Sequence, residues 1–209
     1  VRAPGTLFEY NNGNYTLLEL LIEEVTGSKF STYMRQVVFE PLGMDAATYR
    51  PRSDQLATPY DENRRPLPQA HANVGNASGG LYTTASDLAR LAAATMRGEE
   101  GSAPGKGILK PETVAAMIAR APEAGGRYGL GYKIFPVSDT LTMVGHDGSN
   151  PGWNAFFMTA PEKGVGIVVL TNSRSGASIV ADIVCAWADW ETGIELTGLC
   201  DGAKPIPHR

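Results

Sequence analysis

Four β-patterned runs joined by short connections occupy residues 128–171, and they limit the fold more than any other feature of this chain. Their apolar and aromatic residues mix with smaller ones, as in strands buried mainly on one face. Connections this short join antiparallel neighbours, because parallel strands need a longer crossover. We therefore predict an antiparallel meander covered by a helix at about residues 177–191, with strands at 128–135, 141–145, 153–160 and 165–171.

The N-terminal part is predicted to be helical. Apolar residues at 18, 21, 22 and 25 fall on one helical stripe, with Asn14 as a candidate N-cap and Gly27 as a left-handed C-cap. A second helix should start near Ser31 and stop at Pro41, because proline interrupts helical hydrogen bonding. The two helices are expected to pack as a pair.

The middle of the chain combines a long connection with two more helices. Periodicity is lost over residues 49–80, and loops of that length are usually functional or disordered. Thr84 and Asp87 have the spacing of a capping box, and Pro111 suits the first turn of a helix to about Ala121. The predicted class is mixed α/β (α+β): residues 1–125 are mostly helical, 126–195 hold the sheet and its covering helix, and 196–209 form a tail.

Composition narrows the function classes. The chain has 209 residues, of which 43% are hydrophobic, enough to bury a core. The net charge of −4 and scattered Lys and Arg residues give no footprint for nucleic acid. The longest aliphatic run, Ile167–Leu170, is too short for a membrane span. Cys185 and Cys200 are spaced so that a disulfide is allowed without being specified.

Two short polar motifs are the candidate functional residues. In Gly145–Gly152, a sheet edge should present His146 and Asp147, while Gly148 lets a substrate approach the backbone closely. The alternative is a polar hairpin turn. Tyr10-x-Asn12 offers a phenol for proton transfer and an amide for a substrate carbonyl; alternatively it is a turn before a helix. A metal site from His71, His146 and Asp147 lacks regular ligand spacing, so no metal or cofactor is predicted.

Taken together and in order, the motifs resemble those of the serine β-lactamase-like hydrolases, a family that includes class C β-lactamases, D-Ala-D-Ala carboxypeptidases, D-aminopeptidases and carboxylesterases. The resemblance covers about residues 4–191. The motifs are Tyr10-x-Asn12, Pro41-Leu42-Gly43-Met44, Gly79-Gly80-Leu81-x-Thr83-Thr84-Ala85-x-Asp87-Leu88-Ala89, Tyr128-Gly129-Leu130-Gly131-Tyr132, Gly145-His146-x-Gly148 and Thr171-Asn172.

The resemblance implies a β-lactamase/transpeptidase-like fold and a role for each matching residue. Tyr10 would be the general base and acid, and Asn12 would hold the substrate amide. His146 would act electrostatically, and the Ser149 N–H would form half of the oxyanion hole. The substrate would be a small ester, amide, peptide or β-lactam. The family resemblance favours a periplasmic or secreted protein, and a cytoplasmic one stays open.

The chain departs from the family pattern in one respect. The family's nucleophile motif, Ser-x-x-Lys, does not occur in these residues, and Thr26-Gly27-Ser28-Lys29, which has the spacing, is interpreted as a helix cap. We therefore expect one domain whose N-terminal part is missing and which is inactive alone. The alternative is a non-catalytic binding or structural module on the same scaffold.

Two further expectations follow. An unsatisfied strand edge at Val165–Thr171 and an apolar groove should make the chain bind its missing segment or self-associate. An ionised Asp147 in the groove would repel a substrate carboxylate and favour neutral esters, amides or free amines; alternatively, Asp147 points away and caps the turn at Asn150.

Overall fold

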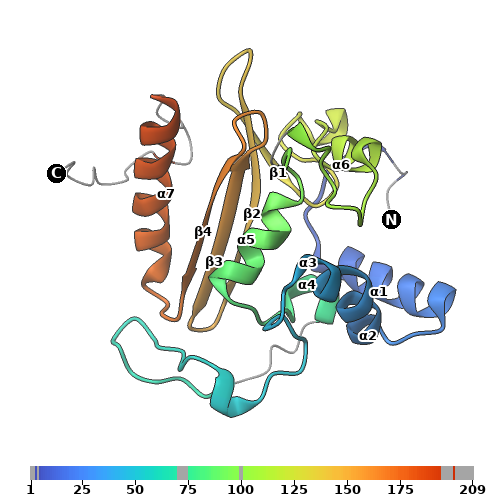
Figure 1. Cartoon of the computed structure of the whole chain (residues 1–209). Helices are drawn as coiled ribbons and strands as arrows, with labels where there is room; N and C mark the ends of the chain where they lie inside the picture. The colour runs from blue at the N-terminus through green and yellow to red at the C-terminus, as the bar shows by residue number, and fades with distance from the viewer. Residues whose placement is uncertain (1–2, 4, 70–74, 99–100, 194–199, 201–209) are drawn as a thin grey trace.

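The structure, a computed structural model, describes residues 3, 5–69, 75–98, 101–193 and 200 of the chain. Helices come first and the sheet comes last, which confirms the predicted mixed class (Figure 1). The sheet lies at the centre, with α7 (Gly176–Thr192) against one face and α5 (Ala85–Ala93) against the other. The helices α1 (Asn12–Thr26), α2 (Phe30–Met34) and α3 (Glu40–Leu42) form a separate group at the side of the molecule (Figure 1).

The sheet is the predicted antiparallel meander, with strand order β1-β2-β3-β4. Two predicted boundaries were wrong. The first strand starts at residue 133 rather than 128, because Gly131 with φ of 84° turns the chain before it. The second continues to residue 150 rather than 145. The strands are β1 (Lys133–Pro136), β2 (Thr142–Asn150), β3 (Trp153–Ala160) and β4 (Val165–Thr171).

Alternation along the strands divides the core between the two faces of the sheet. Met143, Phe156 and Met158 pack with Val180 and Val184 of α7 in one apolar cluster. The neighbouring residues on the strands point the other way, and Val144 and Ile134 form a second cluster with Tyr132, against which Met117, Ile118 and Phe157 pack. The α7 face therefore carries odd-numbered residues of β2, and the opposite face carries even-numbered ones.

The first helix, α1 (Asn12–Thr26), ends at Gly27 with φ of 66°, as predicted. Its start was predicted wrongly, because the N-cap is Asn11 rather than Asn14. Asn11 has extended backbone, and its side-chain oxygen accepts a hydrogen bond from the Gly13 N–H at 2.7 Å. Asn12 therefore occupies the first turn of α1.

The second helical segment continues past Pro41, contrary to the prediction. It consists of α2 (Phe30–Met34), the π-helical η1 (Arg35–Phe39) and α3 (Glu40–Leu42), and it ends at Gly43 with φ of 66°. The π turn lets the Glu40 N–H donate to Arg35, so the chain widens where the proline ring would otherwise clash with the preceding turn.

The described part of residues 49–80 is anchored to the sheet, although it has little regular structure. Only η2 (Ser53–Gln55) and α4 (Asn76–Gly79) interrupt it. The Tyr60 N–H donates to the Asn172 carbonyl at 2.9 Å, just beyond β4, and the Asn172 side chain donates to Thr58 at 2.7 Å. This connection therefore packs beside the end of the sheet (Figure 1).

The remaining helices follow the predicted caps. Thr84 accepts a hydrogen bond from the Asp87 N–H at 3.2 Å at the start of α5. The Asp87 carboxylate does not complete a capping box; it accepts from the Ala46 N–H at 2.8 Å and pairs with Arg90. α6 (Pro111–Met117) begins at the predicted proline and ends before residue 121, and η4 (Pro122–Ala124) follows. Cys185 and Cys200, left open by the sequence, form a disulfide.

Several apolar residues lie on the surface of the helical group. No residue of α1 is buried, and the exposed fractions of Leu17, Leu20 and Val25 are 66%, 53% and 76%. β4 forms the outer strand of the described sheet and pairs only with β3 there. The outer position of β4 in the described sheet agrees with the predicted edge, whereas the exposed residues of α1 define no groove, so the groove stays a prediction.

Candidate functional site

The structure brings the two polar motifs together. Tyr10 precedes α1 and His146 lies on β2, yet their rings stack with centroids 6.2 Å apart and an interplanar angle of 29°. The Tyr128 ring lies beside both, with its centroid 6.2 Å from that of Tyr10 and 6.0 Å from that of His146. The Phe8 ring packs against Tyr128 with a centroid distance of 5.0 Å. Tyr10 is 58% exposed, so the phenol is accessible from outside the described structure.

The histidine motif lies on a strand rather than in a turn. β2 continues to Asn150, and the hairpin turn is only Pro151-Gly152, where Gly152 has φ of 80°. β1 pairs with β2 as far as Gly145, opposite Lys133. From His146 onward, in the described part of the chain, β2 is therefore an edge strand on that side.

The register indicates which backbone groups face this edge. Asn150 and Trp153 flank the two-residue turn and form a hydrogen-bonded pair, and such pairs alternate along an antiparallel ladder. The N–H and C=O groups of His146 and Gly148 are then directed to β3, whereas those of Asp147 and Ser149 are directed to the open edge. The Ser149 N–H is thus directed to the open edge of β2.

His146 has hydrogen-bonding partners at both ring nitrogens. Nδ1 lies 2.6 Å from the backbone carbonyl oxygen of Asp147, which can only accept, so Nδ1 carries a hydrogen. Nε2 lies 2.8 Å from the Tyr128 hydroxyl. Burial, with smaller contributions from Tyr10, Asp147 and Tyr15, raises the pKa of Tyr128 to about 12, so the phenol is protonated at neutral pH.

Asp147 is paired rather than isolated. Its carboxylate forms an ion pair with Lys133, and the side chains are 47% and 34% exposed, respectively. Lys133 opposes Gly145 across the ladder, which places it diagonally next to Asp147 on the same sheet face. Strand alternation puts both on the α7 side, whereas His146 points to the other.

The glycines at 145 and 148 differ in what surrounds them. A Cβ at Gly145 would lie 2.1 Å from the Phe157 carbonyl oxygen and 2.9 Å from the Met158 Cα, so packing explains that glycine. A Cβ at Gly148 would meet no atom of the described structure within 4 Å. The space above Gly148 is therefore available to a bound molecule.

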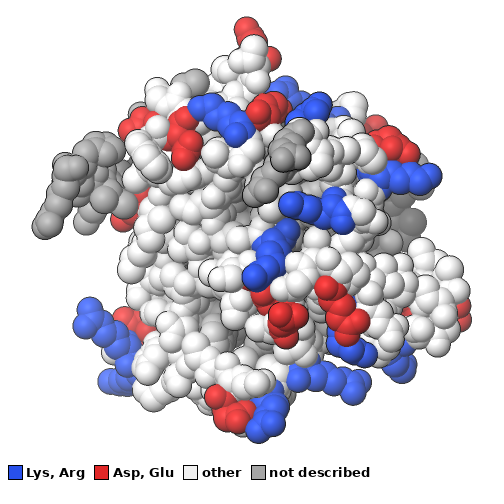
Figure 2. Space-filling model, viewed as in Figure 1, with Lys and Arg blue, Asp and Glu red and all other residues white. Residues whose placement is uncertain are grey.

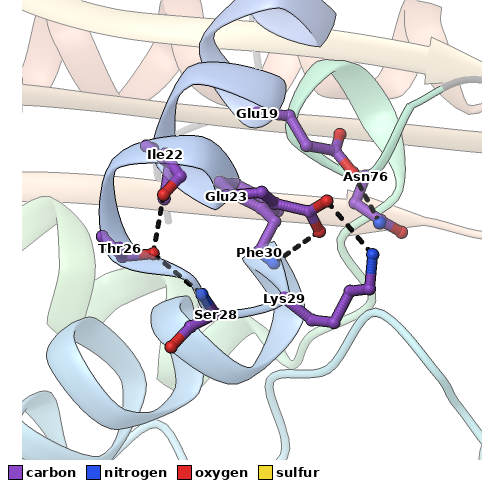
Figure 3. Close-up of polar contacts among 8 residues, drawn as sticks. All are labelled: Glu19, Ile22, Glu23, Thr26, Ser28, Lys29, Phe30 and Asn76. Carbon is purple, nitrogen blue, oxygen red and sulfur yellow. Dashed lines mark hydrogen bonds and ion pairs between the residues drawn. The ribbon is translucent and has the colours of Figure 1, made fainter.

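The Thr26-x-x-Lys29 spacing does not form a nucleophile pair. The Thr26 hydroxyl donates to the Ile22 carbonyl at 2.6 Å, and the Lys29 amine pairs with the Glu23 carboxylate at 3.3 Å (Figure 3). The Ser28 N–H lies 3.3 Å from the Thr26 hydroxyl oxygen. These contacts close the end of α1, as the cap interpretation predicts.

Two neighbours of the candidate site were not among the sequence predictions. Tyr128 belongs to Tyr128-Gly129-Leu130-Gly131-Tyr132, which was treated as a family motif and as the start of a strand without a role for Tyr128 itself, and Lys133 was not singled out. The glycines within the motif signalled a turn rather than a strand. The turn before β1 lies beside the edge of β2, and from it the Tyr128 side chain reaches His146.

On the face that Figure 2 shows, Lys, Arg, Asp and Glu are interspersed over the surface. Within the described ranges, no group of three or more His, Cys, Asp or Glu could hold a metal ion; His71 lies outside them. None of the helices in that part of the chain is long and apolar enough to cross a membrane.

Comparison with known proteins gives concordant matches. A family model described as Beta-lactamase matches residues 1–183. The chain is 26% identical to a D-aminopeptidase of Brucella anthropi, over 93% of the chain and 41% of that protein. It is 25% identical to a beta-lactamase of Yersinia enterocolitica, over 82% of the chain and 52% of that protein.

Solved structures agree with the sequence matches. The octameric penicillin-binding protein homologue from Pyrococcus abyssi superposes with a TM-score of 0.75 and 28% identity, over 95% of this chain and 45% of that one. A penicillin-binding protein from Bacillus halodurans superposes with a TM-score of 0.73 and 27% identity, over 88% of this chain and 57% of that one. The chain spans about half the length, or less, of the curated relatives it matches.

Proposed function

Because the chain belongs to the beta-lactamase family, we propose that its Tyr10 and His146 motifs form one wall of the active site of a hydrolase that acts through an acyl-enzyme. The observation that carries the proposal is the ring stacking of Tyr10 on His146, which unites motifs far apart in the sequence. Tyr10 is exposed, and β2 has an open edge from His146 onward in the described sheet. A substrate lying along that edge could reach both.

Each residue in this wall has a chemical role in the proposal. Tyr10 takes the proton from an attacking hydroxyl and returns it to the leaving group. The Ser149 N–H stabilises the oxyanion of the tetrahedral intermediate. Asn12, in the first turn of α1, binds the substrate amide, and the unfilled space at Gly148 lets the acyl group approach the strand.

We propose that the acylated serine comes from a part of the protein outside this sequence. Ser-x-x-Lys is absent here, and the Thr26 and Lys29 side chains are engaged elsewhere. The same outside part, or a second copy of the chain, would cover the exposed leucines of α1 and the edge of β4. The octameric Pyrococcus abyssi homologue shows that a relative self-associates.

A serine-directed probe tests this assignment. The 209-residue chain and the full-length gene product are each treated with a fluorophosphonate and with a fluorescent penicillin. We expect labelling of the full-length protein by at least the fluorophosphonate, and none of the 209-residue chain. Light scattering on the same samples should show the shorter chain as oligomeric or aggregated. Stoichiometric labelling of a serine in the 209-residue chain would refute the proposal, and an unlabelled full-length protein would favour a binding module.

The substrate is proposed only as a class. Relatives include a D-aminopeptidase and a beta-lactamase, so the proposed acyl donor is a peptide, an amide, an ester or a β-lactam. The ion pair with Lys133 reduces the charge that Asp147 presents. A preference for substrates without a carboxylate therefore requires that the paired Asp147 still repels a negatively charged substrate.

A further inference from the structure

The hydrogen bonds of His146 leave its neutral ring no uncommitted nitrogen. The Asp147 carbonyl accepts from Nδ1–H at 2.6 Å, so the neutral ring has Nε2 as an acceptor. The Tyr128 hydroxyl, 2.8 Å away, is the donor that fits Nε2. A neutral histidine bonded in this way brings an oriented dipole to the groove rather than a positive charge.

We propose that Tyr128 is a positioning residue that holds His146 as the neutral Nδ1–H tautomer, with its ring stacked beside Tyr10. Three contacts support this role besides the hydrogen bond. Tyr128 meets the His146 ring edge-on at 79°, lies 6.2 Å from the Tyr10 ring, and is itself held by Phe8 at 5.0 Å. The phenol is thus fixed by packing on one side while it donates on the other.

The charges around His146 are compatible with a neutral ring. Asp147, the next residue on β2, pairs with Lys133 of β1. Across the ladder His146 faces the apolar Phe157. The remaining facing groups are the aromatic rings of Tyr10 and Tyr128, and burial raises the pKa of Tyr128 to about 12, so that phenol is uncharged at neutral pH.

The consequence for the reaction rests on the proposed function. Tyr10 can accept a proton efficiently only if its ring is held in place, and its stacking partner is His146. Removing the Tyr128 hydroxyl leaves the aromatic packing but releases Nε2, so the imidazole can turn away from Tyr10. Misplacement of a catalytic group by about 1 Å lowers the rate by about a hundredfold.

Nitrogen NMR of the full-length gene product, labelled with ¹⁵N in its histidine rings, tests the assignment without requiring activity. His146→Gln identifies the signals of His146. We expect a protonated Nδ1 and an unprotonated, hydrogen-bonded Nε2 at neutral pH. In Tyr128→Phe the Nε2 resonance should move toward that of a free acceptor. Tyr132→Phe is the matched control, because Tyr132 is a nearby phenol that packs against Phe157 instead, and it should leave His146 unchanged.

Hydrolysis of a p-nitrophenyl ester by the same variants tests the role in the reaction. Tyr128→Phe should lower kcat about a hundredfold with little change in KM, and Tyr132→Phe should alter neither strongly. An Nε2 that carries the proton, or an unchanged Nε2 resonance in Tyr128→Phe, overturns the inference. A shifted resonance with unchanged kcat overturns the positioning role. If the wild type hydrolyses no ester, amide or lactam, the proposed function fails, and the NMR result still decides whether Tyr128 sets the tautomer.

Discussion

Gly145 and Gly148 offer a matched pair of substitutions that separates the fold from the proposed groove. They lie on the same strand, and each becomes alanine. At residue 145 the new Cβ would lie 2.1 Å from the Phe157 carbonyl oxygen, a backbone atom of the paired strand that cannot rotate away. Overpacking of this kind destabilises by about 1 to 3 kcal/mol, and we expect Gly145→Ala at the upper end of that range.

Gly148→Ala should have the opposite sign. No described atom lies within 4 Å of the added Cβ, and residue 148 is not among those with positive φ. Replacing glycine at such a position stabilises by about 0.4 to 1 kcal/mol through the unfolded state. Urea unfolding of the full-length protein, followed by tryptophan fluorescence, measures both variants. An equal loss of stability in the two variants would contradict the contact geometry.

Activity then decides what the space at Gly148 is for. Gly148→Val places a β-branched side chain, which strands tolerate, where the substrate is proposed to approach. We expect kcat/KM for a p-nitrophenyl ester to fall by roughly tenfold or more, with the free energy of unfolding within about 1 kcal/mol of wild type. If kcat/KM is unchanged while the protein remains folded, Gly148 does not line the groove and the reasoning is refuted.

Three other predictions concern the ion pair, the disulfide and a buried phenol. In the full-length enzyme, Asp147→Thr should raise kcat/KM for a carboxylate-bearing substrate relative to a neutral ester, and Lys133→Met should lower that ratio. We expect a change of only roughly threefold to tenfold, because the interaction of exposed charges is screened well below the unpaired Coulomb energy. An unchanged ratio in both variants argues against selectivity at Asp147. The Cys185–Cys200 disulfide joins residues 15 apart in the sequence, and closing a loop of that length stabilises by about 3 kcal/mol. Urea titrations with and without reductant should therefore differ by that free energy of unfolding, and equal midpoints would contradict the prediction. Burial, and to a smaller extent Tyr15, raises the pKa of Tyr132 from 10.0 to about 12. The contribution of this phenol to stability is therefore present below pH 10 and is lost as pH rises from 10 to 12. Over that window the free energy of unfolding of Tyr132→Phe should fall by about 3 kcal/mol less than that of the wild type, as measured by urea unfolding at each pH.

The sheet could be predicted because its signals are local. Alternation along each strand and short connections between strands give an antiparallel order without knowledge of distant contacts. The first strand was extended too far because Tyr128 and Leu130 continue the alternation, whereas the left-handed turn at Gly131 breaks it. β2 was cut short because its last residues are polar and small, which strand propensity disfavours although the ladder with β3 continues to Asn150.

The start of α1 shows a different limit. Asn11, Asn12 and Asn14 all have side chains suited to an N-cap, so composition could not rank them. The extended backbone at Asn11, with φ of −151°, decides the cap. The residue before it, Tyr10, contacts His146 and Tyr128, which are distant in sequence.

The partners of the candidate residues could not be predicted, because they depend on register. Lys133 reaches Asp147 only since it opposes Gly145 on the neighbouring strand. Tyr128 reaches His146 only since β1 starts after the turn that carries the phenol. A shift of either strand by one residue would point these side chains to the other face of the sheet.

The long connection makes polar contacts with both elements that position the two motifs. Glu19 of α1 accepts hydrogen bonds from the Asn76 side chain at 2.8 Å and from the Ala77 N–H at 3.0 Å, which fixes α4 against α1 (Figure 3). At the other end of α4, the Gly79 carbonyl accepts from the Asn150 side chain at 3.3 Å, at the tip of β2. Polar contacts therefore run from the helix that follows Tyr10 to the strand that carries His146. Because none of these residues has chemistry of its own in the proposal, we infer that they help to hold the two elements that position Tyr10 and His146.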